Sequence, residues 1–344
     1  MALSNKGNHT KFDLTIPSTG DSLTPISSLY VILETLLFLA ITFGNGMVII
    51  SFIKFPGLRQ KLPHHWLLHL AIADLFLGLA LPFHIFLFLT KNKLSEHIEG
   101  TPFVCLARYG SATLSVEVSL VLLVLLALHV LLSVQYPYKY NVWITPTKLH
   151  AMAGATWIIC IAYCAIPFFG VHNYHEDWTH VNGRNGSETC ELAIIWEAWY
   201  LIVMVGLMLL LIITLCTIYY IIFRLAAQRS RRDSAIISQF TNISKRNTKA
   251  ARTFLLVSAS TVVCFVPFAI CVLIQSEHWY EYGHTTKDDS LLSWLGAGSV
   301  LCLFFHSCLN PVIYSLRLPA FRHAFRAIFT GNCREFRRTS IEQQ

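Results

Sequence analysis

Seven long apolar runs constrain the fold of this chain more than any other feature of the sequence. They cover about residues 28–54, 62–90, 103–136, 148–171, 196–225, 248–275 and 290–315. Each run is long enough to cross the hydrocarbon core of a bilayer as a helix, and the strands of membrane barrels are far shorter. Backbone groups that face lipid must be hydrogen-bonded within their own segment, which a helix provides. The predicted fold class is therefore all-α, a seven-transmembrane helix bundle.

Composition agrees with a lipid-facing surface. The chain has 344 residues, of which 54% are hydrophobic and only 13% are charged, and its mean hydropathy is +0.54. A soluble domain normally carries about 25% charged residues. Seven spans with short loops use most of this length, so we expect no large soluble domain.

Charge predicts the orientation of the chain. The connections after the first, third and fifth runs and the C-terminal tail hold most of the basic residues, such as Lys54, Arg59, Lys61, Lys139, Lys148, Arg224, Arg231, Lys245, Arg334 and Arg338. The opposite connections hold most of the acids, such as Glu96, Glu99, Glu176, Asp177, Glu188 and Asp288. The positive-inside rule then places the N-terminus outside the cell and the C-terminus in the cytoplasm. We expect an extracellular tail over 1–27, the membrane domain over 28–315, and a surface helix with a cytoplasmic tail over 316–344.

The surface helix is predicted from an amphipathic stretch between Leu318 and Phe329. Its apolar side would hold Phe321, Phe325, Ile328 and Phe329, and its basic side Arg317, Arg322 and Arg326. A short helix with this pattern is expected to lie on the membrane surface.

Single residues at particular depths identify a family. The sequence has Gly44-Asn45 in the first run, Asp74 in the second, Cys105 at the outer end of the third, and Trp157 in the fourth. Cys264-Phe265-Val266-Pro267 lies in the sixth run, and Asn310-Pro311-Val312-Ile313-Tyr314 closes the seventh. Along essentially the whole chain, this set resembles the rhodopsin-like G-protein-coupled receptors. The resemblance implies a multi-pass plasma-membrane receptor that binds an extracellular ligand and meets a heterotrimeric G protein and/or arrestin on its inner face.

The resemblance also assigns a polar cluster around Asp74. A carboxylate inside the membrane must face the bundle interior and find polar partners. The family positions are Asn45, Ser119, His306, Ser307, Asn310 and Tyr314, and in the family such a cluster holds a sodium ion at rest. Because His306 stands where many relatives have asparagine, a buried acid that is merely hydrogen-bonded is the alternative. Pro267 and Pro311 are expected to kink their helices.

Three kinds of covalent modification are expected outside the spans. The resemblance pairs Cys105 with Cys190, since both lie on the oxidising side. Cys333 follows the surface helix and is either palmitoylated or a free thiol. The sequons at Asn8 and Asn185 fall on the extracellular side and are candidate glycosylation sites.

Within the family, several local runs resemble adenosine receptors. They include Leu29 to Glu34, the segment Pro137-Tyr138-Lys139-Tyr140-Asn141, and Lys249-Ala250-Ala251-Arg252. The purine-binding positions differ, because the ring and acid after the loop cysteine are Leu192 and Ala193 here. The amide donor of the sixth span is Val272, and the polar pair of the seventh is Leu303 and Phe304. We therefore expect the frame of such a receptor without its purine site.

The sequence also lacks the residues that two other classes of ligand require. The acid that pairs with an ammonium ligand in the third span is Ala112 here, and the seventh span has no lysine for a Schiff base. Two buried acids remain, Glu34 and Glu117. An acid inside the membrane is a functional candidate, and a protonated acid bonded to a neighbour is the alternative for Glu117. The remaining pocket positions favour an apolar or lipidic ligand, or none: Phe265, Phe268, Val272, Val300, Leu303 and Phe304.

The inner end of the third span lacks a familiar tripeptide. Where relatives have an acid, an arginine and an aromatic residue, this chain has His129, Val130 and Leu131, followed by Pro137. Val130 has no charge and no hydrogen-bond donor, so the usual contact with the G protein is lost. We interpret His129 as a neutral capping group, with a pH sensor as the alternative.

Three function classes follow. The first is a G-protein-coupled receptor with an unidentified ligand, and the second is an atypical receptor that binds a ligand or partner with weak or no G-protein activation. The third, a channel or transporter, would have paired half-helices or internal repeats, and the sequence has neither. We find no enzyme motif and expect no cofactor apart from the candidate sodium ion. The basic inner loops face lipid headgroups and cytosolic partners, so nucleic acid is not an expected partner.

Overall fold

The computed structural model describes residues 25–89, 102–136, 139–172, 195–233, 240–282 and 290–331. Within these ranges, seven helices are long and apolar enough to cross a membrane. They are α1 (Pro25–Lys54), α3 (Leu62–Leu89), α5 (Pro102–Gln135), α7 (Pro146–Ala165), α10 (Ala198–Asp233), α11 (Phe240–Tyr282) and α12 (Ser290–Arg317). The described residues form no strand, only an isolated bridge between His172 and Trp196. The predicted seven-helix bundle is confirmed.

Four short helices complete the described chain: α2 (Pro56–Arg59), α6 (Tyr140–Trp143), the 3₁₀ turn η1 (Ile166–Phe169) and α13 (Pro319–Phe329). Local signals set several of their ends. Thr145 caps α7 by accepting from the backbone N–H of Lys148 at 3.4 Å, so that helix begins two residues before the apolar run. The turn η1 ends at Gly170, whose φ of 98° suits a residue without a Cβ.

Helices α10 and α11 extend at their facing ends beyond the apolar runs that predicted them. The runs were expected to end at residue 225 and to begin at residue 248, whereas the helices reach Asp233 and start at Phe240. Hydropathy marks only the part of a helix that contacts lipid. The added turns of α10 are rich in alanine, arginine and glutamine, which are good helix formers, whereas the first turns of α11 are polar but contain weaker helix formers.

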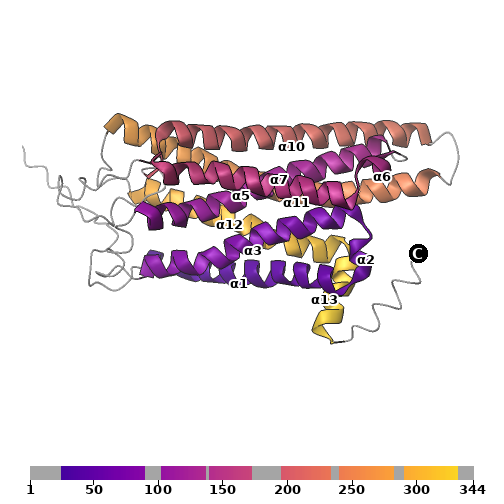
Figure 1. Ribbon diagram of the computed structural model, residues 1–344, viewed down its shortest axis with the longest axis horizontal. Helices are drawn as coiled ribbons and strands as arrows, with labels where there is room; N and C mark the ends of the chain where they lie inside the picture. Colours follow the sequence, from indigo (N-terminus) through magenta and orange to yellow (C-terminus); the bar gives the residue numbers. More distant parts are fainter. Residues whose placement is uncertain are drawn as a thin grey trace, which may run out of the picture.

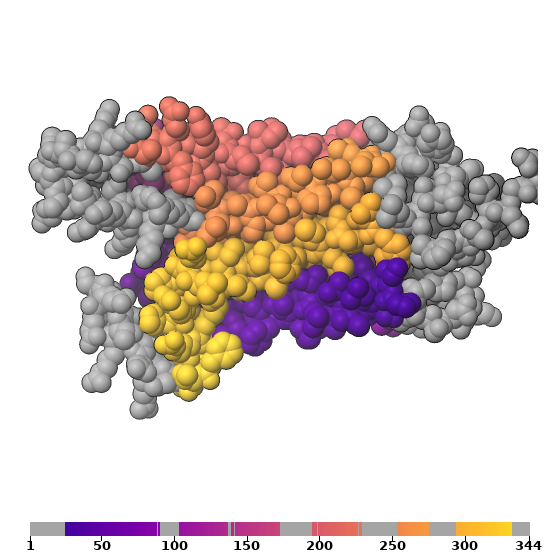
Figure 2. Space-filling model, turned by 180° about the vertical axis from the view of Figure 1, so that it is seen from behind, coloured from indigo at the N-terminus to yellow at the C-terminus, as the bar shows by residue number. Residues whose placement is uncertain are grey.

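The helices form one elongated bundle, with α10 along one side and α13 turned across the end of the bundle (Figure 1). From behind, α10, α11, α12 and α1 follow one another across the face (Figure 2). Helix α5 packs against α3, α7, α10 and α11 and has the largest buried share of the seven spans. Large apolar side chains on the outer helices point away from the protein, as at Ile158 (70% exposed) and Val263 (69% exposed). This surface requires lipid as its solvent.

Helix α13 lies against α1 and α12. The buried residues of α13 are Phe321, Ala324 and Ala327. The Phe321 ring contacts the ring of Tyr314 at a centroid distance of 5.9 Å. On the expected apolar side, Phe321 is buried against the bundle and Phe329 is 67% exposed, as a side chain that faces lipid would be. Phe329 is the last residue of its helix and contacts only the edge of the bundle, with its ring 6.0 Å from that of Phe43.

Candidate functional site

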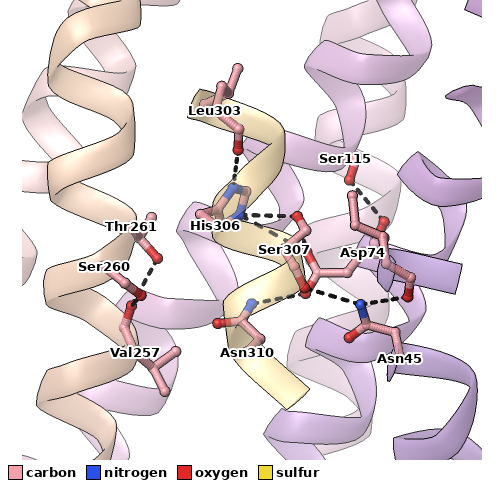
Figure 3. A network of polar contacts seen from close by, with 12 residues as sticks. Asn45, Asp74, Ser115, Val257, Ser260, Thr261, Leu303, His306, Ser307 and Asn310 are labelled. Carbon is pink, nitrogen blue, oxygen red and sulfur yellow. Dashed lines mark hydrogen bonds and ion pairs between the residues drawn. The ribbon is translucent and has the colours of Figure 1, made fainter. Parts of the chain in front are cut away.

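A buried polar cluster lies where α1, α3 and α12 meet, at the positions that the sequence singled out. Asp74 of α3 is completely buried and accepts two hydrogen bonds from α12 (Figure 3). Ser307 Oγ donates to Asp74 Oδ1 at 2.7 Å, and Asn310 Nδ2 donates to Asp74 Oδ2 at 2.8 Å. Hydrogen bonds to a charged group are among the stronger ones in proteins, so this carboxyl ties α3 to α12.

Asn45 joins α1 to the same cluster. Its Nδ2 donates to the carbonyl of Ile41 at 3.0 Å and to the carbonyl of Ser307 at 3.1 Å. The adjacent Gly44 permits this approach, because a Cβ added there would lie 3.0 Å from Pro311 Cγ. The Gly44-Asn45 pair therefore combines close packing against Pro311 of α12 with a hydrogen bond across the two helices.

His306 stands beside the carboxyl group of Asp74. Its Nδ1 contacts the carbonyl of Leu303, so this nitrogen carries a hydrogen. Its Nε2 lies 3.9 Å from Asp74 Oδ1 and 3.4 Å from Ser307 Oγ. In the neutral ring, Nε2 is an acceptor that faces another acceptor. A proton or a cation placed between them would remove that repulsion.

Two further oxygen atoms of these residues, Asn45 Oδ1 and Asn310 Oδ1, have no hydrogen-bond partner among the described residues, whereas the Ser119 hydroxyl is close enough to interact with Asp74. Buried polar atoms normally have a partner in protein or in ordered water. The cluster therefore holds more acceptors than the protein itself satisfies. Tyr314, which was predicted to belong to it, is fully buried below the cluster, and its hydroxyl also has no described partner.

The predicted ligand-pocket residues separate into two adjoining apolar groups. Phe304 packs with Ile41, Leu77 and Leu81, and Ala112 and Val300 contact this group. Phe265, Phe268, Val272 and Leu303 instead pack with residues of α5 and α10, such as Val116, Met204 and Met208. Val300 touches both groups. Leu192 lies outside the described residues.

The two buried acids lie in different places. Glu117 faces α7, near Cys160 and Cys164, and its Oε1 has no described partner. The structure therefore does not bring Glu117 to Phe304. Glu34 lies at the outer half of α1, is 1% exposed, and also has an unpartnered Oε1.

Sequence reasoning missed the basic residues around Glu34. Arg108 of α5 is close enough to interact electrostatically with Glu34 and Tyr30. His84 of α3 contacts the Arg108 carbonyl through Nε2 at 2.9 Å and packs edge-on against the ring of Phe304. An arginine three residues after Cys105, inside a predicted span, was the available signal, because a membrane arginine is a functional candidate.

The inner end of the bundle is apolar at Val130. This side chain is 3% exposed and belongs to one continuous core with Tyr219 of α10, Phe254 of α11 and Tyr314 of α12. Ser258 Oγ donates to the hydroxyl of Tyr219 at 3.2 Å, which joins α11 to α10. Dispersion contacts and this hydrogen bond therefore both contribute to holding the inner ends of the helices together. Leu131 is half-buried against the same core, and Pro137 lies outside the described residues.

The interpretation of His129 as a capping group is wrong. His129 is 2% exposed, and neither of its ring nitrogens has a hydrogen-bond partner among the described residues. Its ring packs edge-on against Tyr140 of α6, with centroids 5.8 Å apart. Helix α5 ends at Gln135, six residues after His129. The His129 side chain therefore points into the packed helices and does not reach the free backbone groups at the end of the helix.

The structure describes one of the two cysteines of the expected disulfide. Cys105 at the outer end of α5 is disulfide-bonded, and the other described cysteines are free: Cys160, Cys164, Cys216, Cys264, Cys271, Cys302 and Cys308. The expected partner, Cys190, lies outside the described residues, as do Asn8, Asn185 and Cys333. The described residues contain no group of histidines, cysteines and acids that could hold a metal ion.

Seven membrane-crossing helices around a buried acid, with prolines in α11 and α12, define a helical membrane protein. Comparison with known proteins identifies its family. Residues 44–314 match the 7 transmembrane receptor (rhodopsin family). The chain therefore belongs to the rhodopsin family and is a cell-surface G-protein-coupled receptor.

Individual relatives span several subgroups of that family. The chain is 25% identical to the histamine H2 receptor of Rattus norvegicus, over 90% of this chain and 81% of that protein. It is 24% identical to the adenosine receptor A2a of Equus caballus, over 89% and 73%. It is 25% identical to cannabinoid receptor 1 of Xenopus laevis, over 88% and 63%. The three identities lie within one percentage point, so overall identity does not favour the adenosine receptors among them.

Proposed function

We propose that this receptor activates its G protein weakly or not at all, because an apolar contact replaces the charged switch at its inner end. The observation that carries the proposal is the burial of Val130 in a core shared by α5, α10, α11 and α12. A receptor switch requires two states that differ in free energy and a partner that prefers one of them. In this chain, a G protein that reaches the side chain of Val130 finds neither a charge nor a hydrogen-bond donor there.

The size of the loss follows from the chemistry of the contact. A hydrogen bond to a charged group contributes about 1.5–3 kcal/mol, whereas a few dispersion contacts of a valine contribute roughly 1 kcal/mol or less. The difference, about 0.5–2 kcal/mol, lowers the affinity for the G protein roughly two- to thirtyfold. Coupling is weakened and not necessarily abolished, since the basic inner face remains.

Cell signalling tests this proposal. The constitutive second-messenger output of the wild type should be compared with Val130→Arg and with the pair His129→Asp/Val130→Arg at equal surface expression. We expect the pair to exceed the wild type by roughly tenfold. Val134→Arg is the matched control, because Val134 lies one turn further along α5 in the same core. Equal output from the wild type and the restored pair would contradict the proposal.

We further propose an apolar or lipidic ligand for the outer half of the bundle. The candidate pocket is walled by Phe304 and Val300 on one side and by Phe265 and Val272 on the other. These side chains cannot satisfy the hydrogen bonds of a purine, and an unpaired polar group in such a site costs about 1–3 kcal/mol. Glu34, with Arg108 beside it, is the polar end at which such a ligand would be oriented.

A sodium ion in the Asp74 cluster is part of the same proposal. Asn45 and Asn310 each carry an amide oxygen without a described partner, both side chains belong to the Asp74 cluster, and a hard cation prefers oxygen ligands. The residues present therefore fit the ion, and a bound ion would stabilise the resting packing of α3 against α12. His306 supplies a nitrogen in place of an oxygen, so we expect weaker sodium binding than a full oxygen set would give.

Charge supports an N-terminus outside the cell and a C-terminus in the cytoplasm. Lys54, Arg59, Lys148 and Arg317 all lie at one end of the described helices, and basic residues are retained on the cytoplasmic side. With this orientation, arrestin and anionic lipid are further partners of the inner face, and Cys105 with Cys190 closes the outer loop.

A further inference from the structure

Two cysteines face each other across the seam between α11 and α12. Cys264 of α11 and Cys302 of α12 are both free, and their thiol groups are close enough to hydrogen-bond to each other. Neither residue belongs to the Asp74 cluster or to the inner core around Val130. A disulfide requires two Cβ atoms about 3.5–4.5 Å apart, and thiols in contact across two packed helices can meet that requirement.

A second contact along the same seam supports this pairing. Cys271 Sγ lies 3.8 Å from the carbonyl oxygen of Leu295, which places these two residues at one level of α11 and α12. The two helices are consecutive membrane spans and run in opposite directions. About two turns further inward, at 3.6 residues per turn, α11 reaches Cys264 and α12 reaches Cys302. The register of the two helices therefore brings the two thiols together.

The chain contains another pair of neighbouring cysteines that lacks this geometry. Cys160 and Cys164 lie one turn apart on α7, and both are buried. Residues one turn apart on a helix have Cβ atoms about 5–6 Å apart, which exceeds the separation that a disulfide allows. The position of Cys264 and Cys302 on two different helices is therefore what permits a bond between them.

The seam lies on the lipid-facing surface of the bundle. Helices α11 and α12 run side by side on one outer face (Figure 2). Side chains next to the two cysteines face the bilayer, since Val263 is 69% exposed and Phe305, about one turn from Cys302, is 45% exposed. Cys302 is half-buried, whereas Cys264 is 4% exposed. An apolar reagent dissolved in the bilayer therefore reaches Cys302 first.

We propose that Cys264 and Cys302 form an oxidation site for organic hydroperoxides dissolved in the bilayer, which convert the two thiols into a disulfide between α11 and α12. The Cys302 sulfur attacks the terminal peroxide oxygen, the O–O bond breaks, and the leaving oxygen takes the thiol proton, which gives a sulfenic acid and an alcohol. The Cys264 sulfur then attacks the sulfenic sulfur, the S–S bond forms, and water leaves. The two thiols together lose two electrons, and the hydroperoxide gains them.

The membrane protects the product from reduction. Glutathione, which keeps cytosolic thiols reduced, is charged, and a charged group is costly inside a bilayer. An apolar hydroperoxide enters the hydrocarbon core without that cost. The site is therefore open to the oxidant and closed to the usual reductant, so the bond should persist once it has formed.

The bond would act beside the proline of α11. Pro267 lies inside this helix, about one turn outward from Cys264, and has no N–H to bond the carbonyl one turn earlier. The part of α11 on the inner side of Pro267 is therefore the part that can move, and a bond from Cys264 would hold it against α12. This restraint does not depend on how strongly the receptor couples to a G protein.

Treatment of the purified full-length protein in phosphatidylcholine bilayers with cumene hydroperoxide tests the site. Mass spectrometry of a non-reducing digest should recover Cys264 linked to Cys302. The thermal midpoint should rise by roughly 5 °C, as expected for a disulfide of ordinary strength in a chain of this length. A charged phosphine reductant should leave the bond intact in the bilayer and should break it after the protein is unfolded in dodecyl sulfate.

Variants separate this pair from general thiol oxidation. Cys302→Ser should lose both the cross-link and the rise in the midpoint. Cys271→Ser is the matched control and should behave as the wild type, because Cys271 lies on the same seam but faces a carbonyl group. In Cys264→Ser, the sulfenic acid at Cys302 has no resolving thiol, so dimedone should trap it.

Three results would overturn the proposal. The first is recovery of Cys264 and Cys302 as free thiols from the treated wild type. The second is a rise in the midpoint that persists in Cys302→Ser. The third is a cross-link between Cys160 and Cys164 that forms as fast as the one between Cys264 and Cys302, which would show oxidation without regard to geometry.

Discussion

The hydrogen bond from the Ser307 hydroxyl group to Asp74 should stabilise this receptor more than the hydrogen bond of any other single hydroxyl group. The variant Ser307→Ala removes a donor 2.7 Å from a completely buried carboxyl oxygen. His306 Nε2 is 3.9 Å from that oxygen, which is too distant to replace the bond. Leaving a charged acceptor without its partner costs about 1.5–3 kcal/mol.

Thermal inactivation of the purified protein measures this cost. For a chain of this length, 1.5–3 kcal/mol corresponds to a midpoint roughly 2–4 °C lower, compared at one scan rate because membrane proteins seldom refold. Ser260→Ala is the matched control: Ser260 Oγ donates to the Val257 carbonyl within its own helix, and such local bonds add little. If Ser307→Ala lowers the midpoint no more than Ser260→Ala, the Asp74 cluster does not hold α3 to α12 as described.

Three further predictions concern the ligand, the ion and the outer loop. Radiolabelled adenosine should show no saturable binding to membranes at submicromolar concentrations, because Val272 and Phe304 cannot pair with a purine; such binding would mean that the pocket is misassigned. Sodium chloride should raise the thermal midpoint of the wild type above its value in choline chloride, by mass action on the folded state, and Asp74→Asn should remove the difference; an unchanged difference would place the ion elsewhere. Mass spectrometry of a non-reducing digest should recover Cys105 linked to Cys190, and recovery of both as free thiols from surface-expressed protein would refute the pairing.

The fold was predictable because lipid permits few solutions. Long apolar runs must be helices in a membrane, so the seven spans followed directly from hydropathy. The ends of α10 and α11 did not, since their outermost turns are polar and hydropathy marks only the part of a helix that contacts lipid. The periodicity of α13 assigned a side to each residue but could not show which apolar residues pack on the bundle, as Phe321 does, and which are left exposed, as Phe329 is.

The candidate sites were predictable where one residue type has one physical role. Asp74, Ser307 and Asn310 were grouped correctly, because a buried acid must recruit polar partners. Glu117 was grouped with Phe304, although the helix turns it towards α7, and a sequence does not give the rotation of a helix about its axis. His65 and His69 of α3 contact His150 of α7 across 85 and 81 positions of sequence, and only the packing of α3 on α7 brings them together.

Nucleotide exchange on a purified heterotrimeric G protein tests the central claim about Val130 most directly. The receptor would be reconstituted into bilayers at a fixed density, as wild type, as His129→Asp/Val130→Arg, and as the Val134→Arg control. The account predicts that the wild type and the control accelerate exchange weakly, and that the restored pair accelerates it roughly tenfold more, as expected for about 1.4 kcal/mol of added contact energy. Wild-type exchange as fast as that of the restored pair would contradict the account.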